Sequence, residues 1–271
     1  MNTDSELEEI IKGLDPYFKA LGIDFFIVGA RARDIISREA GLKLSLRKTL
    51  DVDFGLLVES WETLESMRDK FQSNPDIKLN NEANKVRYYY KGMPFDLVPF
   101  GGIEKKGEVS WPPFYDVIMT VVGYKEALAS AKEIKIGSTS VKVVIPEMLV
   151  GLKLVSWGEN PSRQRDAQDI NYIMSNYESI DPDAYEYILE NYDNILENFD
   201  HDTVLSSIAL IGLRIKKTTS DAHLEIALNL LNDQQRKEKL ARNMISRTGH
   251  DDGEEEASRL KLDALLYGLL M

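Results

Sequence analysis

The apolar positions of the first half of the chain change their period several times, which predicts alternating helices and strands. Apolar residues recur at helical spacing over residues 5–21. A continuous apolar run over 23–28 predicts a strand that leads into a helix near residue 30. A β-branched run ending at Val58 predicts another strand, followed by a helix over 60–71. This order predicts a sheet flanked by helices.

Further short apolar runs are separated by tight-turn signals. Two pairs of runs look like hairpins that turn at Lys91-Gly92 and at Gly137-Ser138. All of these runs are expected to complete one mixed sheet. The predicted strands lie near residues 85–90, 94–98, 117–122, 133–136 and 140–145.

From Pro146 onward the pattern is almost wholly helical, and proline suits a first helical turn. Asp181-Pro182 predicts the start of a helix that runs to about residue 198. The acidic run 251–256 is expected to be a mobile loop between helices. The fold class is therefore α+β, with a domain at 1–145 and a helical domain at 146–271. The remaining helices are expected near 201–217, 220–232, 234–247 and 256–270.

Composition narrows the possible classes of protein. The chain of 271 residues has no cysteine, which excludes disulfides, thiol nucleophiles and thiolate metal sites. Its net charge of −12 argues against broad, non-specific binding of nucleic acid. The polar, acidic start is unlike a signal peptide, and no apolar run reaches the ~18 residues that a membrane span needs. We expect a cytoplasmic protein that does not act at a membrane.

Asp51 and Asp53 lie at the start of the strand that ends at Val58. Residues i and i+2 of a strand point to the same face, so the two carboxylates repel each other. A divalent cation removes this repulsion, and carboxylate oxygens suit Mg²⁺. The alternative is an ordinary solvated strand end, which would also tolerate two aspartates.

Gly29 lies where the strand over 23–28 turns into a helix. Glycine lets the backbone approach a ligand closely, and the free N–H groups at a helix start bind phosphate. Arg31 and Arg33 add positive charge at the same place. The alternative is a tight turn with two solvated arginines.

Asp96 interrupts the otherwise apolar strand near 94–98. A carboxylate in such a strand needs a partner. We expect it to be the third ligand of a metal held by Asp51 and Asp53. The alternative is a buried salt bridge to Arg87.

Four blocks of sequence in this order resemble a known family. They are Gly29-Ala30-Arg31-Ala32-Arg33, then Thr49-x-Asp51-x-Asp53-Phe54, then Asp96, and finally Pro146–Trp157 with Arg165-Asp166-Ala167-Gln168-Asp169. Together they resemble the minimal nucleotidyltransferases of the DNA polymerase β superfamily, closest to the AbiEii-type predicted nucleotidyltransferase toxins. The resemblance covers roughly residues 20 to 177. It departs from the family pattern at Ala30, where a serine that contacts a nucleotide phosphate is usual.

The resemblance implies a Mg²⁺-dependent transfer of NMP from an NTP to a hydroxyl of RNA or protein. Asp51, Asp53 and Asp96 would hold two Mg²⁺ ions and carry the catalysis. Nucleotide binding would fall to Gly29, Ala30, Arg33, Lys153, Arg165 and Asp169.

The resemblance also implies a cognate antitoxin as a partner. Two alternatives remain open. One is a transferase that modifies a small molecule such as an aminoglycoside. The other is a nucleotide-binding interaction module without turnover.

Overall fold

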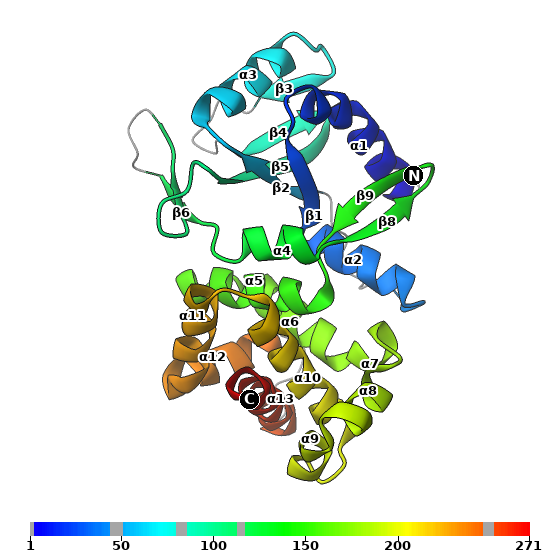
Figure 1. Cartoon of the computed structure of the whole chain (residues 1–271), viewed down its shortest axis with the longest axis vertical. Helices are drawn as coiled ribbons and strands as arrows, with labels where there is room; N and C mark the ends of the chain where they lie inside the picture. The colour runs from blue at the N-terminus through cyan, green and yellow to red at the C-terminus, as the bar shows by residue number, and fades with distance from the viewer. Residues whose placement is uncertain (1–2, 44–50, 80–85, 113–116, 246–251) are drawn as a thin grey trace. The chain divides into compact units, whose positions relative to one another are not determined.

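A computed structural model describes residues 3–43, 51–79, 86–112, 117–245 and 252–271 (Figure 1). The chain forms two compact units. The first is Met1–Asp34 with Ser45–Ile145, and the second is Ile35–Leu44 with Pro146–Met271. The division therefore falls within a helix, α2 (Gly29–Glu39). The second unit takes in residues that the sequence prediction assigns to 1–145.

The first unit is built on a seven-stranded mixed sheet in the order β3-β4-β5-β2-β1-β9-β8. β1 is antiparallel to β2, whereas β2 and β5 are parallel, as are β1 and β9. The predicted α+β class, with a mixed sheet flanked by helices and a helical region after it, is confirmed. The strands are β1 (Asp24–Val28), β2 (Val52–Val58), β3 (Ile77–Leu79), β4 (Arg87–Tyr90), β5 (Met93–Gly101), β8 (Lys132–Ile136) and β9 (Thr139–Val143).

Both predicted hairpins are present. β4 and β5 are joined by Lys91 and Gly92, whose φ angles of 47° and 82° fit the tight turn that matches the twist of paired strands. β8 and β9 are joined by Gly137, with φ 60°, and Ser138. The first hairpin places β4 and β5 in a fixed register, which decides the geometry of the candidate site.

The helices α1 (Thr3–Ala20) and α3 (Trp61–Gln72) lie over one face of the sheet (Figure 1). Aromatic side chains pack between this face and the two helices. Phe54, Phe95 and Tyr88 come from three adjacent strands, and Phe71 of α3 packs edge-on against both Phe95 and Tyr88. The opposite face carries α4 (Tyr124–Ser130), whose Tyr124 packs on Phe26 and Phe100. Side chains alternate between faces along a strand, so the residues between these aromatics on β2 and β5 share the α4 face.

One predicted strand does not join the main sheet. β7 (Ile118–Thr120) instead pairs with β6 (Glu108–Ser110) in a separate two-stranded sheet. The prediction was wrong here because an apolar run specifies a strand but not its partner. Residues 122 and 123 lead into α4, which was not predicted.

The second unit consists of helices in its described residues. The predicted single helix from Asp181 to about 198 is two helices, because the chain breaks at Tyr192, with φ −148° and ψ 47°. The acidic run was expected to be a loop, but its described part, from Asp252, lies within the last helix. Acidic side chains favour a helix N-terminus through the helix dipole. The helices are α5 (Pro146–Glu159), α6 (Gln164–Ser175), α7 (Tyr177–Ile180), α8 (Ala184–Asn191), α9 (Asp193–Asn198), α10 (Thr203–Thr218), α11 (Asp221–Asn232), α12 (Gln234–Met244) and α13 (Asp252–Leu270).

Two glycines let α10 and α13 approach at backbone contact. A Cβ on Gly268 would lie 1.8 Å from the carbonyl oxygen of Ala209, and one on Gly212 would lie 2.2 Å from that of Leu265. The described helices include none that is long and apolar enough to cross a membrane.

Gly268→Ala is expected to lower the free energy of unfolding by about 1–3 kcal/mol, because a methyl group has no room between two backbones. Gly158→Ala in α5 is the matched control, since the nearest atom to its added Cβ is the flexible Leu230 Cδ1 at 3.0 Å. Denaturant unfolding of both variants measures the difference. Equal stability of the two would contradict the close helix crossing.

Candidate active site

Four strands present one transverse row of residues in the first unit. Val28 of β1 is paired with Asp53 of β2, Asp53 with Asp96 of β5, and Asp96 with Arg87 of β4. Directly paired residues on neighbouring strands point to the same face, with Cβ atoms about 5 Å apart. The structure thus brings Asp53 and Asp96 together, as two of the three predicted metal ligands.

Arg87 binds two of the three predicted metal ligands, Asp96 in this row and Asp51 just before β2. Its Nε and Nη2 donate to the two Asp96 oxygens at 2.7 and 2.8 Å, and Nη2 also donates to Asp51 Oδ2 at 2.7 Å. These hydrogen bonds, with that to Asp96 foremost, raise the pKa of the Arg87 guanidinium against the opposing effect of burial. The salt bridge to Arg87 that the sequence offered as an alternative for Asp96 is therefore present, although Asp96 is only partly buried.

The carboxylates form a suitable set of donors for a hard cation, but Arg87 occupies the place between Asp51 and Asp96. Within the described ranges, no three acidic or histidine side chains are already arranged as a metal site. The three aspartates are nevertheless brought together by adjacent strands and by chain proximity, and two of them already share one cationic group. Metal binding by Asp51, Asp53 and Asp96 stays a prediction.

Gly29 follows Val28 directly and lies against the Asp53 carboxylate. Its φ is +69°, and a Cβ added there would meet Asp53 Oδ2 at 2.0 Å. The position requires glycine both for its backbone conformation and for its space. The end of β1, the start of α2 and the row of carboxylates therefore meet at one point.

The residues after Gly29 differ from a solvated turn. Ala30 is half-buried, whereas Arg31 and Arg33 are buried, with 6% and 2% of their surfaces exposed. Arg33 Nε donates to Asp34 Oδ1 at 3.0 Å. In the described part of the chain, Nε of Arg31 has no hydrogen-bond partner. A buried guanidinium N–H without an acceptor at a helix start is a suitable donor for an anionic ligand.

The remaining predicted nucleotide-binding residues lie in the second unit. Lys153 of α5 is buried and its Nζ contacts Asp166 Oδ1 at 2.9 Å and Asp169 Oδ2 at 2.8 Å, both on α6. Burial alone would lower the pKa of the Lys153 ammonium, but the two carboxylates outweigh it and the pKa is raised. Arg165 is exposed. Their role toward a nucleotide stays a prediction.

A second charge cluster in this unit, around the buried Glu147 and Tyr177, was not predicted. The Arg214 guanidinium of α10 contacts Glu147 at 3.0 Å and the Tyr177 hydroxyl at 2.6 Å, and it also pairs with Asp181. Burial and the neighbouring Glu147 raise the pKa of Tyr177. The available signal was a charged residue inside an apolar helical pattern at both Glu147 and Arg214.

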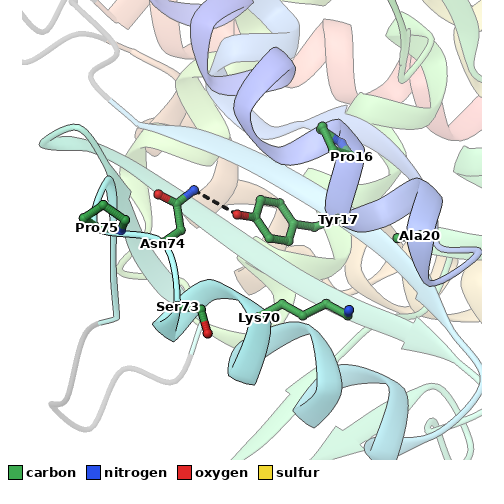
Figure 2. A pocket seen from close by; sticks show the side chains of 7 residues that line it. All are labelled: Pro16, Tyr17, Ala20, Lys70, Ser73, Asn74 and Pro75. Atoms are coloured by element: carbon green, nitrogen blue, oxygen red, sulfur yellow. Dashed lines mark hydrogen bonds between the residues drawn. The ribbon is translucent and has the colours of Figure 1, made fainter.

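A surface hollow lies away from this row. It measures about 480 Å³ and lies between α1 and the end of α3 (Figure 2). There the Asn74 side chain donates to the Tyr17 hydroxyl at 2.9 Å. Its other lining residues are Pro16, Ala20, Lys70, Ser73 and Pro75, none of which belongs to the candidate site.

Comparisons with known proteins give weak likenesses. No family model matches the chain, and no curated protein matches it. An antigenic nucleotidyltransferase-like protein from Paracoccidioides brasiliensis is similar at 19% identity over 72% of this chain and 91% of that one, with a TM-score of 0.41.

Two further solved structures are similar at lower identity. The antibiotic-resistance factor ANT(2'')-Ia matches at 14% over 59% of this chain and 76% of its own, with a TM-score of 0.34. A tRNA-processing enzyme matches at 12% over 94% and 77%, with a TM-score of 0.31. All three TM-scores lie below 0.5, so the inferences about the site rest on the residues of this chain.

Gly29→Ala is expected to destabilise the protein more than Gly22→Ala by about 1 kcal/mol or more. Both glycines have positive φ, +69° and +66°, but a Cβ on Gly22 has nothing within 4 Å. The control therefore carries the same backbone cost without the clash with Asp53. Thermal unfolding measures the stability that each variant loses. Equal losses for Gly29→Ala and Gly22→Ala would show that the Asp53 carboxylate is not in close contact with Gly29.

Lys153→Met is expected to cost about 3–5 kcal/mol, because it removes the buried ammonium that Asp166 and Asp169 share, although Asp166 keeps Arg163 at 2.8 Å. Lys237→Met is the control, since it removes an ion pair whose Asp263 partner is half-exposed, and it should cost less than about 1 kcal/mol. Chemical denaturation measures both. Since the pKa of Lys153 is raised, its contribution should be full at neutral pH and be lost only as the pH rises above the ordinary range of lysine.

Proposed function

We propose that this protein is a Mg²⁺-dependent nucleotidyltransferase that moves NMP from an NTP to a hydroxyl of RNA or protein. The observation that carries the proposal is the meeting of Gly29, at the start of α2, with the paired Asp53 and Asp96. A phosphate site beside a cluster of carboxylates is what metal-assisted transfer from a nucleoside triphosphate requires.

In the first unit, one group of residues would bind the phosphates and another would bind the metal ions. Backbone N–H groups at the start of α2 would bind the triphosphate, with the buried Arg31 as an additional donor. Asp51, Asp53 and Asp96 would hold the Mg²⁺ ions, expected to be two. Bound Mg²⁺ would supply positive charge to the phosphate oxygens and to the leaving group. These backbone donors would bind phosphate without the serine hydroxyl that Ala30 replaces.

The reaction forms one bond and breaks one. The acceptor hydroxyl oxygen bonds to the α-phosphorus, and the bond from that phosphorus to the bridging oxygen breaks, so pyrophosphate leaves. The hydroxyl proton passes to Asp96, or through it to solvent. Positioning and charge stabilisation would contribute most of the rate enhancement, as in other phosphoryl transfers.

The acceptor and the biological role extend the proposal further. The sequence resemblance favours an AbiEii-type toxin, with RNA or protein as acceptor and an antitoxin as partner, over an enzyme that modifies a small molecule. In this reading Lys153, Arg165 and Asp169 would contribute to nucleotide binding. The Arg87 contacts favour a second candidate, a nucleotide-binding module without turnover, because a guanidinium already neutralises two of the carboxylates.

Asp53→Ala is expected to lower transfer of label from an α-labelled NTP by roughly 10²-fold or more. The assay offers each NTP with Mg²⁺ and, in turn, cellular RNA, cellular protein and an aminoglycoside. Asp24→Ala is the matched control, since it removes an exposed aspartate from β1 of the same sheet. It should retain wild-type transfer.

The pattern of transfer separates the candidates. Tight binding of Mg²⁺ and NTP without transfer to any of these acceptors would favour the binding module. Growth arrest on expression that Asp51→Ala relieves would identify a toxin. Equal transfer by wild type and Asp53→Ala would contradict the proposed site.

A further inference from the structure

We infer that Arg87 is an internal counter-ion that competes with the divalent cation for Asp51 and Asp96, so that the cation binds only when the Arg87 side chain leaves them. The inference rests on the proposed function, because it concerns the same carboxylates. It assigns to Arg87 the control of metal affinity at this site.

The hydrogen bonds of Arg87 use the oxygens that a cation would need. Its Nε and Nη2 engage both oxygens of Asp96, and Nη2 also engages Oδ2 of Asp51, all at 2.7–2.8 Å. Mg²⁺ binds carboxylate oxygens at about 2.1 Å and demands near-octahedral geometry. A guanidinium and a divalent cation at the same oxygens would also repel each other strongly, since they would be only a few ångströms apart. Occupation by one therefore excludes the other.

The sequence places Arg87 where such a counter-ion is needed. The register of β2 and β5 sets Asp53 opposite Asp96, and like charges directly opposite each other destabilise a sheet. Arg87 is the partner of Asp96 on its other side, in β4. Its bidentate fork stabilises the carboxylates in the metal-free protein, as planar Arg–carboxylate pairs do.

Arg87 is also free enough to leave. Its side chain is 29% exposed, and its backbone is held in β4 independently of the side-chain contacts. The pair with Asp96 is largely shielded from solvent, with 29% and 16% of the two side chains exposed, so the charge of the incoming cation has to offset the loss of these contacts. The exchange requires rotation of one side chain and no change in the sheet.

The test is the affinity of the metal-free full chain for Mn²⁺. Binding is measured as the loss of the electron paramagnetic resonance signal of free Mn²⁺. Arg87→Gln should bind Mn²⁺ at least about tenfold more tightly than wild type, because the competing charge is gone. Arg87→Lys should fall between the two, since it keeps the charge and loses the fork. If Arg87→Gln fails to fold, the affinity of Arg87→Lys for Mn²⁺ tests the inference in its place. Lys142→Gln removes one positive charge from an exposed pair in the same sheet and should match wild type.

A second readout is thermal unfolding. Without metal, Arg87→Gln should melt below wild type, and saturating Mn²⁺ should raise its melting temperature by more than it raises that of wild type. An additional Asp96→Asn substitution should remove the gain in affinity. Binding by Arg87→Gln alone, with none by wild type, would be the strongest support.

Two results would overturn the inference in distinguishable ways. If wild type and Arg87→Gln bind Mn²⁺ equally, or the variant binds more weakly, Arg87 does not compete and the proposed function stands. If neither binds Mn²⁺, with or without an NTP, the metal site itself is wrong. The inference and the metal-dependent function then fail together.

Discussion

The register of β2 against β5 is the constraint on which the candidate site depends. It pairs Asp53 with Asp96, and the β4–β5 hairpin then pairs Asp96 with Arg87. A slip of one residue in either pairing would turn a charged side chain into the aromatic face beneath α1 and α3. The packing of Phe54, Phe95, Tyr88 and Phe71 therefore fixes the positions of the polar residues on the opposite face.

Local signals in the sequence predict much of this arrangement. Gly29 at a strand-to-helix turn, the Asp51-x-Asp53 spacing and the Lys91-Gly92 hairpin each follow from conformational rules that act over a few residues. The hairpin even implies that Arg87 and Asp96 lie opposite each other. What the local pattern does not specify is strand order, because pairing between β2 and β5 joins distant segments. For the same reason β7 pairs with β6 and not with the main sheet.

The sequence pattern does not predict whether a metal ion or an arginine neutralises these carboxylates. Two carboxylates on one face need positive charge, but a cation from solution and an arginine on the next strand satisfy the same requirement. The sequence suggests both a metal ion and Arg87 as partners of Asp96, and the structure shows the hydrogen bonds to Arg87. The second unit repeats the problem at the buried Lys153 and the partly buried Arg214, where carboxylates from other parts of the chain balance the charge. Such networks combine residues whose proximity only the tertiary fold establishes.

The most direct test of this account is anomalous diffraction at the manganese edge from crystals of the protein grown with Mn²⁺ and a non-hydrolysable NTP. We expect a peak coordinated by Asp51, Asp53 and Asp96, with the triphosphate at the start of α2 and the Arg87 side chain turned away from Asp51 and Asp96. A nucleotide bound elsewhere, or Arg87 still joined to Asp51 and Asp96 with no peak beside them, would contradict it.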